Sequence, residues 1–195
     1  MATLIKLTRD LAAPMAMAKL DPPAAELLRG CTETAMALDR LQNAGELISA
    51  ARLGAFALPR REAVWWASMC AAHTAPPGQP AIEVRARETA ELWVRQPDET
   101  TRRLAMDLAR EAGFSVPEAW VAVAAFWSGE SLAPPGEPVV PPAPHLPGTA
   151  VAGAIAMASV RGDPASRDTR LERFLASLRD IADGGAGRIA SELMS

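Results

Sequence analysis

The stretch that most constrains this chain is residues 117–127, which read Pro-Glu-Ala-Trp-Val-Ala-Val-Ala-Ala-Phe-Trp. After Glu118 this stretch has no polar side chain, and a helix that is apolar all the way round has to be enclosed by other elements. Ser115 and Glu118 have the spacing of a capping box, and Pro117 suits a first helical turn. We therefore predict a buried central helix over residues 117–127, with the rest of the chain as its amphipathic cover.

Further helices are predicted wherever apolar residues recur at helical spacing between typical end signals, such as proline or Asp at the start and glycine at the end. They cover residues 21–30, 33–41, 43–55, 60–73, 81–95, 101–112, 148–160 and 163–184. Within residues 101–112, the pattern predicts that Leu104 faces the core and that Arg102 faces solvent. The fold class is therefore all-α.

The composition of the chain suggests three regions. Residues 1–20 show no sustained period and are predicted to be an extended N-terminal arm. Residues 21–187 form a single helical domain, and residues 188–195 form a short C-terminal tail in a frayed turn. Inside the domain, residues 131–147 are so rich in proline that they favour polyproline II. We expect a rigid strap that crosses the helical body; a recognition segment for a groove is the alternative.

A possible internal duplication bears on the architecture. Ala-Pro-Pro-Gly occurs at residues 75–78 and again at 133–136, each time between a Trp-containing helix and a second helix. Each unit ends in a helix that begins with Thr-Arg, at Thr101 and at Thr169. This pattern indicates two stacked three-helix units. The chain is thus either a multi-helix bundle or a short armadillo-like or HEAT-like α-solenoid.

The charge pattern limits the kinds of partner. The chain has 20 basic and 23 acidic residues, a net charge of −3, with both signs interspersed. It lacks the basic stripe that nucleic acids or membrane surfaces attract, so neither is expected as the main partner. The run 138–160 is uncharged but broken by prolines, and Pro14 interrupts the apolar N-terminal segment. We expect no transmembrane helix, no signal peptide and a cytoplasmic location.

Few residues in the sequence suggest catalysis or metal binding. Cys70 and His73 lie three positions apart on one predicted helix, which is the spacing of half a zinc site or of a thiol–imidazole pair. The only other cysteine and histidine, Cys31 and His145, are distant in sequence. No phosphate-binding loop, nucleophile elbow or His-Glu-x-x-His motif is present. We assign no cofactor and no metal, and keep an enzyme or metal protein using Cys70 and His73 as the alternative hypothesis.

The adjacent tryptophans Trp65 and Trp66 indicate a surface. They point about 100° apart on a helix, so both are buried only if several helices surround them. Trp66, Trp93 and Trp120 are predicted to lie in the core. Trp65, with Arg60 and Arg61, is the predicted exposed protein-binding patch, because Trp and Arg are common anchors of interfaces.

Two segments resemble a known group of proteins. They are residues 57–67, Ala-Leu-Pro-Arg-Arg-Glu-Ala-Val-Trp-Trp-Ala, followed by Cys70-Ala71, and residues 148–163, Gly-Thr-Ala-Val-Ala-Gly-Ala-Ile-Ala-Met-Ala-Ser-Val-Arg-Gly-Asp. Both are similar to an uncharacterised family of Ala-, Arg- and Pro-rich bacterial all-helical proteins associated with type VI secretion gene clusters. The resemblance extends from about Leu27 to Gly184. It implies an accessory or adaptor role and supplies no catalytic residues.

Taken together, these features predict a non-catalytic protein–protein interaction module. The expected partner is another protein, and a homodimer is also open.

Overall fold

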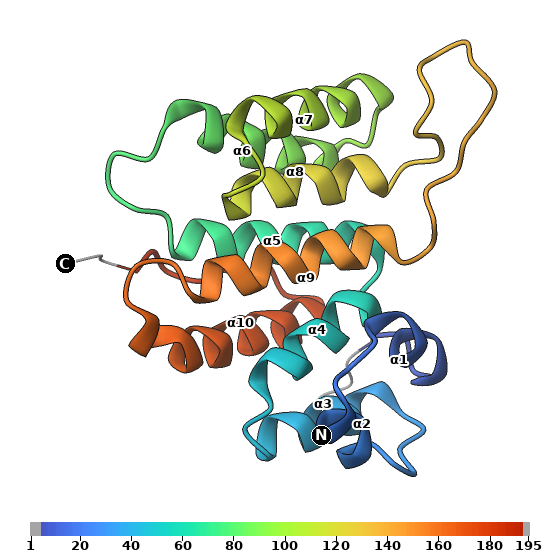
Figure 1. The fold of residues 1–195 in the computed structure, drawn as a ribbon, viewed down its shortest axis with the longest axis vertical. Coiled ribbons are helices and arrows are strands. Elements are labelled where there is room, and N and C mark those ends of the chain that lie inside the picture. Colours follow the sequence, from blue (N-terminus) through green and yellow to red (C-terminus); the bar gives the residue numbers. More distant parts are fainter. Residues whose placement is uncertain (1–4, 193–195) are drawn as a thin grey trace.

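The computed structural model describes residues 5–192, and within them the elements are helical (Figure 1). The all-α prediction is confirmed. The α-helices are α1 (Ala12–Ala18), α2 (Pro22–Leu27), α3 (Thr34–Asn43), α4 (Leu47–Ala57), α5 (Arg60–His73), α6 (Ala81–Arg95), α7 (Glu99–Ala112), α8 (Pro117–Trp127), α9 (Leu146–Ser159) and α10 (Arg167–Ala182), with the 3₁₀ turn η1 (Pro164–Ser166) before α10. None of these helices combines the length and apolarity needed to cross a membrane.

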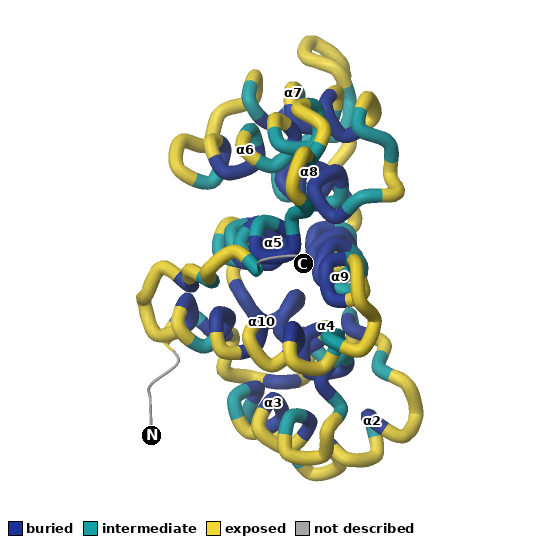
Figure 2. The backbone as a smooth tube through the Cα atoms, turned by 90° about the vertical axis from the view of Figure 1, so that its left-hand side faces the viewer, coloured by how far each residue is buried: buried dark blue, intermediate teal, exposed yellow. Residues whose placement is uncertain are grey.

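The helices form layers around a central pair. Helices α5 and α9 lie side by side across the middle of the molecule (Figures 1 and 2). Helices α6, α7 and α8 pack on one side of this pair, and α4 and α10 pack on the other. Helix α4 also contacts α1 and α3, which extend the second side. One apolar core runs through all these layers.

Helix α8 has the predicted bounds and is buried from Pro117 to Phe126, except for the half-buried Trp120. The predicted capping box is wrong, because Val116 is the N-cap and no side chain caps the helix. Glu118 instead turns inward and is fully buried. Its carboxylate accepts hydrogen bonds from both terminal nitrogens of Arg161, at 2.9 and 2.6 Å. A buried carboxylate needs such a partner, which the capping pattern does not reveal.

Arginine side chains join the helices by binding the carbonyl ends of their neighbours. These carbonyls have no partner within their own helix and lie at the negative end of its dipole. The guanidinium group suits them because it presents several N–H donors in one plane. The pairs are Arg40 with Leu27 of α2, Arg52 with Ala18 of α1, Arg61 with Val94 of α6, Arg102 with Phe126 of α8 and Arg170 with Ser159 of α9.

In helix α7, such an arginine contact reverses the side-chain directions that the apolar pattern predicts. Arg102 is 2% exposed and Leu104 is 45% exposed, so the predicted directions of both side chains are wrong. Arg102 is drawn inward because it binds the carbonyl groups of Phe126 and Ser131 and the carboxylate of Glu99. It also lies over the ring of Phe126, which adds a cation–π contact.

The predicted extended N-terminal arm is wrong for residues 12–18, which form α1. Pro14 stands in the first turn of this short helix, where its missing N–H costs nothing. Pro14 and Ala18 are buried, and α1 packs on α4. Residues 1–4 of the predicted arm lie outside the described residues. The predicted frayed turn at the C-terminus is an extended segment over residues 188–192, and residues 193–195 are not described.

The proline-rich strap does not cross the body. Most of residues 131–145 form an exposed loop that stands away from the helices (Figure 1). The loop closes on itself where the amide of Leu132 donates to the carbonyl of Val140 at 2.7 Å, and Val139 beyond this neck is 71% exposed. Prolines have no N–H to donate to neighbouring elements. Pro142 is buried at the base of the loop, and the chain rejoins the core at Pro147 and Gly148, where Gly148 packs directly against the ring of Phe56.

The two units of the proposed duplication do not pack alike. Helices α6 and α7 lie together along their length, whereas their counterparts α9 and α10 make few contacts. Counterpart arginines, Arg102 and Arg170, are nonetheless both buried and both bind a helix end. The solenoid alternative is therefore not confirmed, and the helices form a layered bundle.

Candidate protein-binding surface

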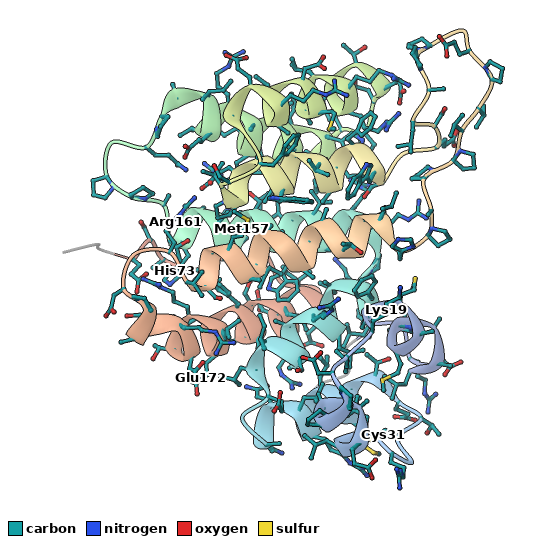
Figure 3. All side chains as sticks on the ribbon, viewed as in Figure 1. Lys19, Cys31, His73, Met157, Arg161 and Glu172 are labelled. Carbon is teal, nitrogen blue, oxygen red and sulfur yellow. The ribbon has the colours of Figure 1, made fainter. Side chains whose placement is uncertain are left out.

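Helix α9 presents a surface without charge. No residue from Leu146 to Ser159 is charged, although one side of the helix reaches the surface. Thr149 is exposed, Ala152, Gly153 and Ala156 are half-exposed, and Met157 lies near them (Figure 3). Surface helices ordinarily carry charged or polar side chains on this side. Packing against the protein's own core therefore does not explain why the exposed side of α9 is uncharged.

A row of aromatic side chains borders this face. Trp120 and Trp127 of α8 are half-exposed, with ring centroids 6.3 Å apart, and Phe114 is 48% exposed, with its centroid 6.1 Å from that of Trp120. The indole of Trp120 donates to the carbonyl of Phe114 at 2.9 Å, which fixes its orientation. A side-chain carbon added to Gly153 would lie 3.9 Å from the Trp120 ring, so the row and α9 adjoin.

These residues are referred to as the α8–α9 face: Phe114, Trp120, Trp127, Ala152, Gly153 and Ala156. Trp120 packs against the core but is only partly buried, whereas Trp66 and Trp93 are buried as predicted. The small residues of α9 leave the Trp120 ring only partly covered. A sequence signal for the face existed in the uncharged run 146–160, where the side chains that would meet solvent are small or apolar.

A hollow lies between α4 and α9, at the edge of the α8–α9 face. Its volume is about 250 Å³. It is lined by Ile48, Ala51, Arg52, Phe56, Thr149, Ala152, Gly153 and Ala156. The lining is apolar except for Thr149 and Arg52, and the Nε of Arg52 is bound to the carbonyl of Ala18 at 2.6 Å. The hollow can take apolar side chains of another molecule beside a single cationic group.

In the predicted patch, each of the three side chains (Arg60, Arg61 and Trp65) binds a different part of the protein. Arg60 donates to the carbonyl of Ser128 at 3.4 Å, and Arg61 donates to that of Val94 at 3.0 Å. Trp65 is half-buried, and its indole donates to the carbonyl of Ala186 at 2.7 Å. Arg95 stacks over its ring. The three side chains thus share the start of α5 but hold different parts of the fold.

The candidate thiol and imidazole lie inside the protein. Cys70 is fully buried, and burial raises the pKa of its thiol well above the ordinary value. His73 is 2% exposed, and its Nδ1 is hydrogen-bonded to the carbonyl of Ala190. The described residues contain no group of three or more His, Cys, Asp or Glu that could hold a metal ion. A neutral, enclosed thiol is a poor nucleophile.

Comparisons with known proteins identify a family. The model of a family described as "Family of unknown function (DUF6931)" matches residues 37–182. No curated protein and no solved structure matches the chain. The matched range runs from α3 to the end of α10 and includes α8, α9 and the hollow between α4 and α9. Because the match covers well over half of the chain, the protein belongs to this uncharacterised family, DUF6931.

Proposed function

We propose that the protein is a non-catalytic protein–protein interaction module that binds an amphipathic helix of a partner on its α8–α9 face. The observation that supports this proposal is the uncharged outer side of α9 beside a row of half-exposed aromatic rings. Exposed apolar patches of this kind mark binding sites for other proteins, and tryptophan is a frequent anchor of such sites.

The shape of the face favours a helix as the bound element. Thr149, Ala152, Gly153 and Ala156 follow one another at i, i+3, i+4 and i+7, so they form a continuous shallow stripe along α9. Small residues let a second helix approach closely. The hollow between α4 and α9 would take apolar side chains of that helix, and the aromatic row would flank its other side.

The charge at the rim suggests one feature of the partner. Arg52 is exposed at the edge of the hollow, where the other lining residues are uncharged. A carboxylate next to the apolar side of the partner helix would meet this guanidinium group. Such a contact would set the register of the bound helix more than its affinity.

The wider role that we propose is that of a bacterial, cytoplasmic accessory or adaptor protein of a secretion system. The resemblance of residues 57–67 and 148–163 to proteins of type VI secretion gene clusters supports this role. A second copy of the chain could use the same face, which would give a homodimer. The alternative role, an enzyme or metal protein based on Cys70 and His73, receives no support from their enclosed positions.

Site-specific photo-crosslinking in the source organism would test the proposal. A photoreactive residue at Ala156 should give a defined protein adduct, and the same residue at Arg85, exposed on α6, should not give it. Gly153→Arg should abolish the adduct, because the long side chain blocks the stripe. Ala81→Arg, at the exposed start of α6, serves as the matched control. Adducts that are the same from both positions, or that survive Gly153→Arg, would refute the proposed face.

A further inference from the structure

The C-terminal segment of the chain lies across a groove between α5 and α10, away from the α8–α9 face. After α10 the chain turns at Gly184 and Gly185 and continues without helix through Glu192. Gly187 is buried, Ile189 is half-buried, and Arg188 and Ala190 between and after them are exposed. This alternation is that of an extended peptide with one side on the protein.

Residues of the two helices hold the main chain of this segment, four through their side chains and His73 also through its main-chain carbonyl. Trp65 and His73 come from α5, and Ser177 and Asp180 come from α10. The contacts are Trp65 Nε1 to the Ala186 carbonyl at 2.7 Å, Ser177 Oγ to the Gly187 carbonyl at 2.5 Å, the Gly187 amide to Asp180 Oδ2 at 2.7 Å, His73 Nδ1 with the Ala190 carbonyl, and the Glu192 amide to the His73 carbonyl at 2.7 Å. The groove therefore recognises an extended backbone over seven residues, 186–192.

The groove also distinguishes three side-chain positions. A carbon added to Gly187 would lie 2.3 Å from Cγ1 of Ile181, so only glycine fits there. Ile189 packs against the apolar core. Glu192 binds the Nε of Arg170 at 2.8 Å, and Arg170 is itself 2% exposed. The pattern that the groove accepts is thus Gly-x-apolar-x-x-acidic.

Two observations distinguish the residues that form the groove from the C-terminal segment that occupies it. A hollow of about 310 Å³ remains beside the segment, lined in part by Arg173, Ala176 and Ile189. All of its lining residues belong to α10 or to the segment itself, so the segment is not closely packed along its α10 side. In addition, the groove residues named above all lie within the family match at 37–182, whereas the segment that fills the groove follows it.

We propose that the α5–α10 groove is a binding site for an extended peptide of another protein with the pattern Gly-x-apolar-x-x-acidic, and that the C-terminal segment occupies it until such a peptide replaces it. The replacement breaks no helix, because the segment is joined to α10 through Gly184 and Gly185. The bonds that the segment gives up are restored by the incoming peptide. The segment competes at the high effective concentration of a short tether.

Fluorescence anisotropy with a labelled peptide tests this site. The peptide comprises residues 184–192 with an amidated C-terminus. The protein is the full chain carrying Ile189→Asp and Glu192→Arg, which weaken its own segment, and circular dichroism confirms that it stays helical. We expect this chain to bind the peptide at least about tenfold more tightly than the wild-type chain does, because the wild-type groove is filled. Peptides with Gly187→Ala or Glu192→Arg should bind at least about tenfold more weakly than the natural one.

A charge reversal identifies the groove as the place of binding. For this test the released chain carries Ile189→Asp and Glu192→Ala, so that its own segment offers no cation at position 192, and adding Arg170→Glu to it should make it prefer the Glu192→Arg peptide. Should this variant fail to fold, Trp65→Phe removes one donor without changing charge and should weaken the natural peptide several-fold. The proposal is overturned if the released chain binds no peptide at about 1 mM. Equal binding by the wild-type chain, or by the Gly187→Ala peptide, would overturn it as well.

Discussion

Glu118 and Arg161 form an ion pair whose carboxylate is fully buried and whose guanidinium is nearly so. Removing Glu118 leaves the largely buried Arg161 charged, with only a long hydrogen bond to the Thr74 carbonyl at 3.5 Å in place of the carboxylate. We expect Glu118→Ala to lower the free energy of unfolding by about 3–5 kcal/mol, measured by urea denaturation. The matched control is Asp107→Ala, which breaks the exposed pair with Arg110 and should cost about 0–1 kcal/mol. Similar losses in both variants would show that burial does not decide the effect.

The two cysteines should differ in reactivity. Cys31 is half-buried, whereas Cys70 is fully buried, and its thiol has a raised pKa because burial disfavours the thiolate. The thiolate is the reactive form, so the folded protein should be alkylated at Cys31 and not at Cys70, even at about pH 9. Mass spectrometry of iodoacetamide-treated protein measures this, and Cys31→Ser should leave the folded chain unmodified. Modification of Cys70 at the rate of Cys31 would contradict the prediction and revive the nucleophile hypothesis.

Single residues also show where sequence patterns stop being informative. Apolar spacing assigned Trp66, Trp93 and the whole of α8 to the core, and this is what burial shows apart from Trp120. The same spacing placed Arg102 outside. A helical pattern depends only on the polarity of each side chain, and it does not show which partners the tertiary structure brings near that side chain. Arg102 meets the end of α8, which lies 24 residues further along the chain.

At the scale of elements, the start of α7 carries a pH-sensitive contact. Hydrogen bonds from Arg102 and Arg103 lower the pKa of Glu99, with the bond from Arg102 the largest cause. A lowered pKa means that the contact stabilises the fold above the unfolded-state pKa and is lost as the pH falls through the folded-state value. The melting temperature of the wild type should therefore fall more between about pH 6 and pH 3 than that of Glu99→Gln. Glu172→Gln, at an exposed position of α10, should behave as the wild type does.

The proline-rich loop is predicted to contribute little to stability. Its residues 134–141 are exposed, and the hydrogen bonds at its neck involve Ser131, Leu132 and Val140. Replacing residues 134–138 with two glycines keeps the neck and changes loop-closure entropy only slightly. We expect the free energy of unfolding to change by less than about 1 kcal/mol in a urea titration. A large loss would mean that the loop supports the helices after all.

The sequence predicted well those helices whose bounds are set by residues of the helix itself and of its two ends. Helices α5, α6 and α8 have the predicted bounds, because proline or glycine marks their ends and the apolar period continues between these marks. Helix α1 was missed since seven residues are too few to show a period. The position of the proline-rich loop could not be predicted, because polyproline composition fixes a local conformation and not what that segment packs against. Likewise, an uncharged α9 indicates close packing without telling whether the neighbour belongs to the same chain.

For the whole molecule, the layered arrangement joins both sides through α5 and α9. Each of these helices contacts α8 on one side and α10 on the other. Unfolding either side would expose the apolar residues of this central pair, so the two sides should unfold together. The family match spans the same helices, from α3 to α10, which agrees with one cooperative unit.

Native-state hydrogen exchange tests this cooperativity. Amides of residues 105–109 in α7 and 171–178 in α10 should show the same opening free energy as urea is added, because both require global unfolding. Gly148→Ala should lower both values together, since the added carbon would lie 2.4 Å from the ring of Phe56 where α9 meets α4. Gly153→Ala is the matched control: its nearest atoms are 3.9 Å away, and alanine favours the helix, so both values should stay or rise by up to about 1 kcal/mol. If Gly148→Ala lowers the protection of α10 alone, the two sides unfold independently.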